Sequence, residues 1–316
     1  METILVTGGA GFIGSHVCDA LLARGKKVVC IDNFNDYYDP RIKEKNIENA
    51  SKNRNFGLYR ADITDYDALR NVFIENKVDK IIHLAARAGV RSSFDEPELY
   101  KKVNVEGTRN LLELAKEFKI KNFVFGSSSS VYGTNKKIPF SENDPTENAI
   151  SPYAETKKKA EELCKQYHDK LGLSIACLRF FTVYGPRGRP DMAVYKFIEL
   201  ISESKPIDVY GDGTSKRDYT YVADIVDGAL SALDKNFGFE VINLGNSDAV
   251  ELKKLIAAIE KELGKKAKIN RLPMQKGDVH LTYANISKAR KLLDYNPKIK
   301  IGEGIKLFAE WYKNDR

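Results

Sequence analysis

A tyrosine and a lysine four residues apart, Tyr153 and Lys157, are the side chains of this sequence best suited to acid–base chemistry. Four residues make about one turn of an α-helix, so the phenol and the ammonium would share one face. Tyrosine has an unperturbed pKa near ~10, and its use as a base at neutral pH requires lowering that value by roughly 3 units. A lysine one turn away favours the phenolate. Tyrosine and lysine also occur often at this spacing on exposed helix faces without a catalytic role. Neighbouring motifs must therefore decide between a catalytic pair and a surface pair.

Glycines near the N-terminus predict a dinucleotide site. Gly8, Gly11 and Gly14 follow the apolar segment 4–7 and open an amphipathic stretch to about residue 24. This strand, turn and helix pattern lets the backbone approach a pyrophosphate, which then lies at the helix N-terminus.

The next two expected strands end in carboxylates. Segment 27–31 leads into Asp32, which could accept hydrogen bonds from the adenosine ribose and would repel a 2′-phosphate, so NAD is favoured over NADP. A role for Asp32 as a turn cap is the alternative. The strand 58–62 ends in Asp62 and Ile63, which could reach the adenine.

The pattern of alternating strands and helices continues to residue 181. A fourth strand, 79–86, ends in small residues and contains His83, interpreted as a packed histidine; a helical stretch follows over 97–118. The fifth strand, 122–125, leads into the serine run 127–130, whose hydroxyls we expect beside the cofactor because they follow a buried strand. The pattern predicts a Rossmann-type doubly wound parallel sheet in an α/β fold, with ligands at the carboxyl ends of its strands.

After residue 181 the elements become shorter. We expect an NAD-binding domain over 1–181 and a smaller mixed α/β substrate lobe over 182–316, with chain segments that can cross between them. The elements expected in the second lobe are a helix to about 204, strands 207–210 and 239–244, helices 222–235 and 248–264, and two terminal helices.

Composition excludes several function classes. The net charge is +7, but lysines alternate with glutamates on helix faces, which indicates a solvated surface rather than a nucleic-acid site and weakly favours an anionic substrate. The four cysteines have no CxxC spacing, so we expect reduced packing residues and no metal site. No apolar run approaches ~18 residues, so we expect no membrane partner and a cytoplasmic protein.

The glycine turn, Asp32, the serine loop and the Tyr-x-x-x-Lys helix occur in the order seen in one enzyme family. With them the chain resembles the extended short-chain dehydrogenase/reductases over essentially its whole length. Within that family it looks like the nucleotide-sugar 4-epimerases, most of all those acting on UDP-glucuronate, because of segments 32–40, 127–133 and 179–193. The resemblance implies oxidation of the sugar at C4 by tightly bound NAD, rotation of the 4-keto sugar, and reduction on its other face.

The resemblance also implies which residues act. Ser128 would be the hydroxyl that works with Tyr153 and Lys157. The residues expected at NAD are Gly8, Gly11, Phe12, Ile13, Gly14, Asp32, Asn33, Asp62, Ile63, Leu84, Ala85, Ala86, Asn104, Tyr153, Lys157 and Phe180. Those expected at the UDP-sugar are Arg91, Ser128, Ser129, Ser130, Tyr153, Thr182, Arg189, Tyr210, Arg217 and Asp278.

Arg217 would bind the diphosphate, Tyr210 the uracil and Asp278 its ribose. Ser129, Ser130, Thr182 and Arg189 could donate hydrogen bonds to a sugar carboxylate, which a neutral CH2OH does not need. A surface salt bridge is the alternative for Arg189.

Several positions depart from the patterns of related enzymes. Family glucose epimerases have asparagine where Thr182 stands, and dehydratases have Asp-Glu at Ser129 and Ser130, so dehydration, which needs a carboxyl group, is disfavoured. Arg87 replaces an expected glutamine. Gln275 replaces a second phosphate arginine, so Arg91 or backbone donors could assist the diphosphate.

Three other functions stay open. The chain could be a UDP-glucose or UDP-N-acetylhexosamine 4-epimerase, because Thr282 stands where some glucose epimerases have a bulky residue. It could be a uronate decarboxylase, although these enzymes have a glutamate at Ser130. It could be an inactive NAD-sensing module, although it has Ser128, Tyr153 and Lys157. Family members commonly dimerise through the helix after the fourth strand and the Tyr153 helix, so a homodimer is expected.

Overall fold

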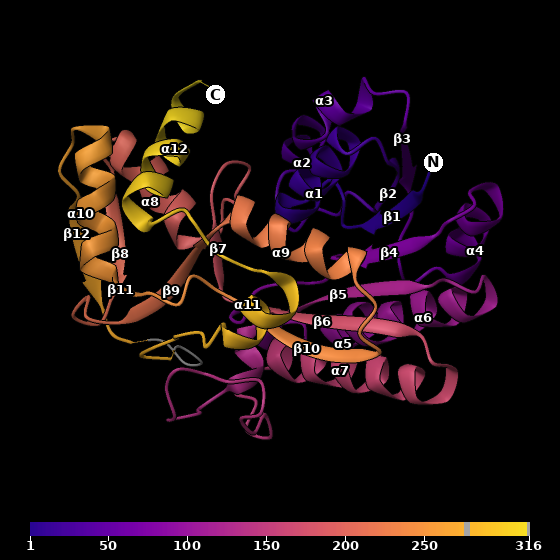
Figure 1. Cartoon of the computed structure of the whole chain (residues 1–316). Helices are drawn as coiled ribbons and strands as arrows, with labels where there is room; N and C mark the ends of the chain where they lie inside the picture. The colour runs from indigo at the N-terminus through magenta and orange to yellow at the C-terminus, as the bar shows by residue number, and fades with distance from the viewer. Residues whose placement is uncertain (275–278, 315–316) are drawn as a thin grey trace.

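The central element is a parallel sheet, described here from a computed structural model covering residues 1–274 and 279–314. Within these residues its seven strands follow the order β10-β6-β5-β4-β1-β2-β3, which confirms the predicted Rossmann-type fold (Figure 1). The order reverses between β1 and β4, the position where such sheets bind ligands. The strands are β1 (Thr3–Thr7), β2 (Lys27–Asp32), β3 (Phe56–Arg60), β4 (Lys80–His83), β5 (Asn122–Ser128), β6 (Ser174–Phe180) and β10 (Phe239–Leu244).

Helices cover both faces of this sheet because its strands are apolar on both sides. In β1, Ile4 and Val6 pack into the core beneath α1 and α9, whereas Leu5 packs into the core on the opposite face beneath α4, α6 and α7. Figure 1 shows α9 on one side of the sheet and α6 and α7 on the other. These helices are α1 (Phe12–Ala23), α4 (Tyr66–Glu75), α6 (Gly107–Glu117), α7 (Pro152–Leu171) and α9 (Val222–Asp234).

Short helices lie in the connections between strands of the large sheet. The helical stretch expected over 97–118 is present, with a π-helical segment in its middle that contains Asn104. The helices are α2 (Pro40–Asn46), α3 (Glu48–Ser51), η1 (Ser92–Phe94), α5 (Pro97–Lys101), the π-helix η2 (Lys102–Glu106) and the 3-10 turn η3 (Ser129–Tyr132). Across the described residues, no helix combines the length and apolar character needed to cross a membrane.

The smaller lobe contains two short sheets packed against three helices. Its sheets have the orders β11-β9-β7 and β12-β8, and α10 packs on both α8 and α12. The elements here are β7 (Thr182–Tyr184), α8 (Ala193–Ser202), β8 (Pro206–Tyr210), β9 (Lys216–Tyr221), β11 (Ala249–Glu251), α10 (Leu252–Leu263), β12 (Lys268–Leu272) and α12 (Ile301–Asn314). Helix α11 (Ser287–Leu293) instead packs on β10 and α9 at the large sheet. The chain crosses back to the large sheet with α9 and β10, since β10 pairs with β6.

Some expected boundaries were wrong. The helix expected over 248–264 begins only at Leu252, because residues 249–251 form β11 and pair with β9. The strand expected over 58–62 lies two residues earlier, and the strand expected over 79–86 ends at His83. Beyond His83 the backbone turns toward the glycines, and the N–H of Ala85 donates to Thr7 Oγ1 at 3.2 Å.

Replacement of Gly14 by alanine is expected to destabilise the fold. A Cβ at Gly14 would lie 2.0 Å from the carbonyl oxygen of Gly8, so α1 would have to move away from β1. We expect the free energy of unfolding to fall by about 2 kcal/mol. Gly302→Ala in α12 is the control, because a Cβ there meets nothing within 4 Å, and it should gain about 0.5 kcal/mol from helix propensity. Urea titration measures the free energy of unfolding of both variants. Equal changes in the two variants would contradict a close packing of α1 against β1 at Gly14.

Candidate functional site

A cavity of about 460 Å³ opens at the carboxyl ends of the large-sheet strands. It extends from the glycine turn to residues of the smaller lobe, including Arg217 and Thr282. The predicted site residues that line it are Gly8, Gly11, Phe12, Ile13, Gly14, Asp32, Asn33, Ile63, Leu84, Ala85, Ala86, Ser128, Ser129, Ser130, Tyr153, Lys157, Phe180, Thr182, Arg189 and Arg217. Residues expected to serve two ligands therefore meet in one cavity.

Among the described residues, the predicted site residues that do not line this cavity are Asp62, Arg91, Asn104 and Tyr210. Asp62 accepts a hydrogen bond from Asn33 Nδ2 at 2.7 Å. Arg91 and Tyr210 contact each other, with the guanidinium 4.7 Å from the ring centroid. Asp278, like Gln275, lies outside the described residues.

Asn104 is buried, and its side-chain amide forms hydrogen bonds with other residues of the chain. It accepts from the backbone N–H of Arg87 at 2.8 Å and donates to the Arg87 carbonyl at 3.0 Å and to Thr156 Oγ1 at 3.1 Å. It therefore ties the loop after β4 to helix α7.

Helix α7 positions the tyrosine and the lysine. It begins after Ser151, whose Oγ accepts from the N–H of Ala154 at 3.2 Å, and Pro152 occupies the first turn. Ser128, at the end of β5, lies close enough to Tyr153 for its hydroxyl to lower the pKa of the phenol. Lys157 is buried one turn later and donates to the carbonyl of Gly126 at 2.7 Å. The serine, tyrosine and lysine expected to work together therefore meet at the seam between β5 and α7.

The electrostatics of the pair follow from burial and nearby groups. Burial raises the pKa of Tyr153, while the Ser128 hydrogen bond and the positive charge of Arg189 oppose that rise. Burial lowers the pKa of Lys157 to about 8, with Glu161 acting in the opposite direction. Lys157 is thus held as a cation near its titration point, where it can favour a phenolate.

A buried ion pair between Glu161 and Arg179 stabilises the contact between β5 and α7. Glu161 receives two hydrogen bonds from Arg179, at 2.9 and 2.8 Å, and one from Ser127 Oγ at 2.5 Å. The Arg179 guanidinium also lies 4.8 Å from the ring centroid of Tyr132. These contacts fix the end of β5 against α7, so the serine loop that follows starts from a rigid point.

The serine loop presents hydroxyls to the cavity. Ser128 Oγ accepts from the N–H of Ser130 at 3.1 Å and lies 3.1 Å from its hydroxyl, which closes the turn η3. Thr182, at the start of β7, lines the same part of the cavity. Arg189 lines it too, although its Nε and Nη2 donate to Asp191 at 2.9 and 2.5 Å. Arg189 therefore both forms the salt bridge that was considered as an alternative and faces the cavity.

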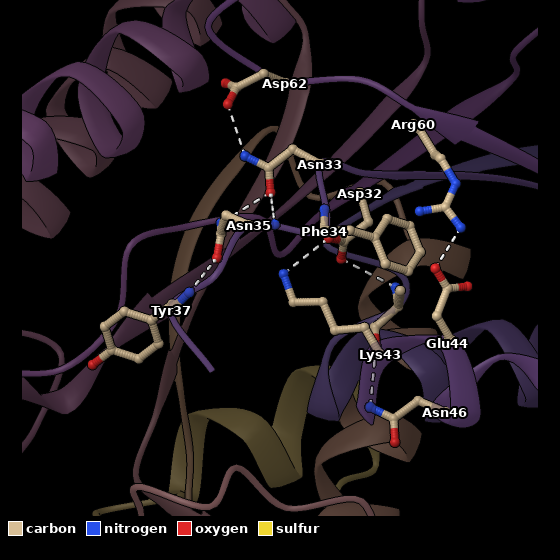
Figure 2. A network of polar contacts seen from close by, with 11 residues as sticks. Asp32, Asn33, Phe34, Asn35, Tyr37, Lys43, Glu44, Asn46, Arg60 and Asp62 are labelled. Carbon is tan, nitrogen blue, oxygen red and sulfur yellow. Dashed lines mark hydrogen bonds and ion pairs between the residues drawn. The ribbon is translucent and has the colours of Figure 1, made fainter. Parts of the chain in front are cut away.

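The opposite end of the cavity has the features of a dinucleotide site. The first N–H groups of α1 have no intrahelical partners, and the absence of a side chain at Gly14 keeps α1 close to β1. The buried Asp32 carboxylate accepts from the N–H of Phe34 at 3.0 Å and from Lys43 Nζ at 3.1 Å (Figure 2). A carboxylate has about four acceptor sites, so capacity is left for a ribose hydroxyl. The residues present fit a dinucleotide.

Several residues that line the cavity were missed by the sequence analysis, and three of them come from the segment after β2. Lys43, from α2, pairs with Asp32, and Tyr37 and Asn35 line the cavity from the loop between β2 and α2. The available signal was the segment 32–40, which was used only for its resemblance to a family.

Residues predicted to have structural roles behave accordingly. The ring nitrogens of His83 bond Thr7 Oγ1 at 2.7 Å and Thr108 Oγ1 at 3.0 Å, and burial lowers its pKa to about 3. All four cysteines are free and buried, which confirms them as packing residues. Among the described residues, no group of three His, Cys, Asp or Glu side chains could hold a metal ion.

Comparison with known proteins gives a consistent assignment. The family model described as GDP-mannose 4,6 dehydratase matches residues 5–308. A UDP-glucuronate 4-epimerase of Thermodesulfobacterium geofontis is 46% identical over 100% of this chain and 97% of its own length. The Bacillus cereus UDP-glucuronic acid 4-epimerase, solved with UDP-glucuronic acid and NAD, has a TM-score of 0.94, 39% identity and full coverage of both chains. The Thermotoga maritima UDP-glucose 4-epimerase, solved with UDP-glucose, has a TM-score of 0.92 and 33% identity over 99% of each chain.

The variant Lys157→Met is expected to be more stable than the wild type at pH 7. The folded protein releases the Lys157 proton at about pH 8, whereas an unfolded lysine retains it to about pH 10. Below pH 8 the buried charge therefore opposes folding, and wild-type stability should rise between these two values. After allowance for the lost Gly126 bond, the variant should gain roughly 1–2 kcal/mol.

Urea titration of nucleotide-free protein from pH 6 to 10 measures this difference. The control is Lys159→Met, whose exposed side chain pairs with Glu155 on the surface of α7. A Lys157→Met variant that is less stable than the wild type at every pH would refute the electrostatic assignment.

Proposed function

Because this chain belongs to the GDP-mannose 4,6 dehydratase family, we propose that it is an NAD-dependent UDP-glucuronate 4-epimerase, an isomerase that interconverts UDP-glucuronate and UDP-galacturonate. One observation carries the proposal: Ser128, Tyr153 and Lys157 share a cavity with Thr182 and Arg189, which are donors suited to a carboxylate. The relatives described above, which act on or bind UDP-glucuronate, support it.

Tyr153 and Ser128 are the proposed groups for proton transfer. Bound NAD supplies the reversible acceptance of hydride from the sugar C4. Tyr153, as phenolate, takes the proton of the C4 hydroxyl, and Lys157 stabilises that phenolate through its positive charge. Ser128 forms a hydrogen bond with the reacting oxygen and relays the proton. It is suited to this role because it lies beside Tyr153 and is held in place by the N–H of Ser130. The 4-keto sugar then rotates about its diphosphate link and regains its C4 hydroxyl with the opposite configuration.

A uronate substrate places a further demand on the site. Its 4-keto form is a β-keto acid, which loses carbon dioxide when the carboxylate bond aligns with the carbonyl π system. Ser129, Ser130, Thr182 and Arg189 are proposed to hold the carboxylate out of that alignment, because all four line the sugar part of the cavity.

The remaining binding roles are proposed by resemblance and by position. NAD would be held by residues of the glycine turn, Asp32, Phe180 and Asn104, and the UDP group would contact Arg217, Arg91, Tyr210 and Asp278. Residues 1–181 would form the cofactor unit and 182–316 the sugar lobe, with α9 and β10 returning to the first unit.

We also propose that the protein is a cytoplasmic homodimer. The four free, buried cysteines are consistent with a reducing compartment. Helices α6 and α7 lie together on one face of the sheet, where they could pair with a second copy. Because α7 carries Tyr153, such an interface would link assembly to the site.

A neutral-sugar 4-epimerase is the second candidate. Thr282 lines the cavity and its hydroxyl accepts from the N–H of Asp218 at 3.2 Å, so no bulky side chain fills this position. The UDP-glucose enzyme of Thermotoga maritima is also similar over nearly its full length.

The first test is to incubate the purified protein, without added NAD, with UDP-glucuronate and separately with UDP-glucose. We expect UDP-galacturonate from the first, no pentose, and little reaction with the second, as resolved by proton NMR. Tyr153→Phe is the control and should lose about 10³-fold in kcat. Conversion of UDP-glucose alone would favour the second candidate, release of carbon dioxide would indicate a decarboxylase, and bound NAD without any conversion would indicate a sensing module.

Removal of the Arg189 guanidinium is expected to weaken recognition of the carboxylate. Arg189→Ala should lower kcat/KM for UDP-glucuronate by at least about tenfold, because a charge-assisted bond is lost, while binding of UDP is unchanged. The control is Arg187→Ala, since Arg187 pairs with Asp19 at 2.6 Å and does not line the cavity. Unchanged catalytic efficiency in Arg189→Ala would remove this assignment.

A further inference from the structure

Tyr37 contacts two arginines that line the sugar part of the cavity. The guanidinium carbons of Arg87 and Arg189 lie 5.1 and 5.3 Å from the centroid of its ring, within the range of cation–π attraction. Tyr37 itself lines the cavity. The ring is therefore placed where it can fix the direction of both cations.

Side-chain bonds within the loop place Tyr37. Asn33 Oδ1 accepts from the N–H of Asn35 at 3.1 Å, and Asn35 Oδ1 accepts from the N–H of Tyr37 at 3.2 Å. Figure 2 shows this series of bonds running from Asp62 through Asn33 and Asn35 to the backbone of Tyr37. Such side-chain to backbone bonds restrict the loop to one conformation. The loop thus connects the cofactor end of the cavity with its sugar end.

The hydroxyl of Tyr37 is anchored by η1, in the segment that follows β4. It lies 2.8 Å from Ser92 Oγ, which also accepts from the hydroxyl of Tyr100 at 3.0 Å. The Tyr100 ring meets the Tyr153 ring edge-on, with centroids 6.3 Å apart. Gly89 permits this approach, because a Cβ there would lie 2.5 Å from the Tyr37 hydroxyl oxygen. The ring is therefore held at both its backbone and its hydroxyl.

Each arginine forms a salt bridge with an acidic residue that does not fully neutralise its positive charge toward the cavity. Arg87 pairs with Glu96 at 3.0 Å and Arg189 with Asp191 at 2.5 Å. The arginine side chains are only 12% and 17% exposed, whereas the acids are 49% and 40% exposed and so better screened by water. Arg87 Nε is buried without a hydrogen-bond partner among the described residues. Positive potential therefore dominates on the cavity side.

We infer that Tyr37 is a positioning residue for substrate choice: it holds Arg87 and Arg189 together at the sugar end, so that the cavity prefers an anionic sugar. This inference rests on the proposed function and extends it, because it gives Arg87 a role and makes the loop after β2 part of specificity. The contacts with the substrate are made by the guanidinium groups. Tyr37 acts through them.

Substrate preference in the holoenzyme tests the inference. Titration calorimetry gives the dissociation constants of UDP-glucuronate, UDP-glucose and UDP for the wild type, Tyr37→Leu and Tyr37→Phe. We expect Tyr37→Leu to reduce the preference for UDP-glucuronate over UDP-glucose by about tenfold, with UDP binding unchanged. Tyr37→Phe keeps the ring and should retain most of the preference. A purely structural defect would weaken all three ligands together.

Two further variants complete the design. Asn35→Ala removes a bond that places Tyr37, should reduce the preference in the same direction, and keeps the test available if Tyr37→Leu does not fold. Asp36→Ala changes the exposed neighbour in the same loop and is the matched control. A wild-type preference that persists in both Tyr37→Leu and Asn35→Ala overturns the inference and leaves the proposed function intact. A wild type without any preference for the uronate overturns both.

Discussion

The buried ammonium of Lys157 is the constraint on which the catalytic end of the molecule depends. A charge in the interior is costly unless it is paired and hydrogen-bonded. Here Lys157 has the Gly126 carbonyl at 2.7 Å and Glu161 one helical turn further along α7. Glu161 is itself bonded to Arg179, so two cations share one anion. The excess positive charge would be balanced by a phenolate at Tyr153, which is the form that a base requires.

This arrangement of charges also restricts the packing of the sheet. Gly126, whose carbonyl accepts from Lys157, has no room for a side chain, because a Cβ there would lie 2.9 Å from Leu84 Cδ2 and 3.2 Å from Phe180 Cε2. Both of those residues line the cavity. Gly126 therefore serves both the catalytic end and the cavity, since it accepts the Lys157 hydrogen bond and leaves room for two lining side chains.

Sequence patterns predicted the features that depend on neighbouring residues. The glycine turn, the helix of Tyr153 and Lys157, and the strand preceding the serine loop are local, and all are present. The return of β10 to the large sheet and the short strands of the smaller lobe depend on pairing between distant segments, which local periodicity does not encode. The same holds for the site. Ser128 follows directly from a strand end, whereas the meeting of Tyr37 with Arg189 requires two loops far apart in the sequence.

The family description names a dehydratase, but the groups in this cavity suit another outcome for a 4-keto sugar. Elimination needs a carboxyl group beside the sugar to move a second proton, and the positions next to Ser128 are hydroxyls instead. Hydroxyls and guanidiniums donate hydrogen bonds, and they can fix a carboxylate without removing a proton from carbon. A ketone that is neither dehydrated nor decarboxylated can only be reduced again. Rotation of the sugar then determines which face of the ketone is reduced. The site therefore favours epimerisation because it lacks the carboxyl groups that the competing reactions require.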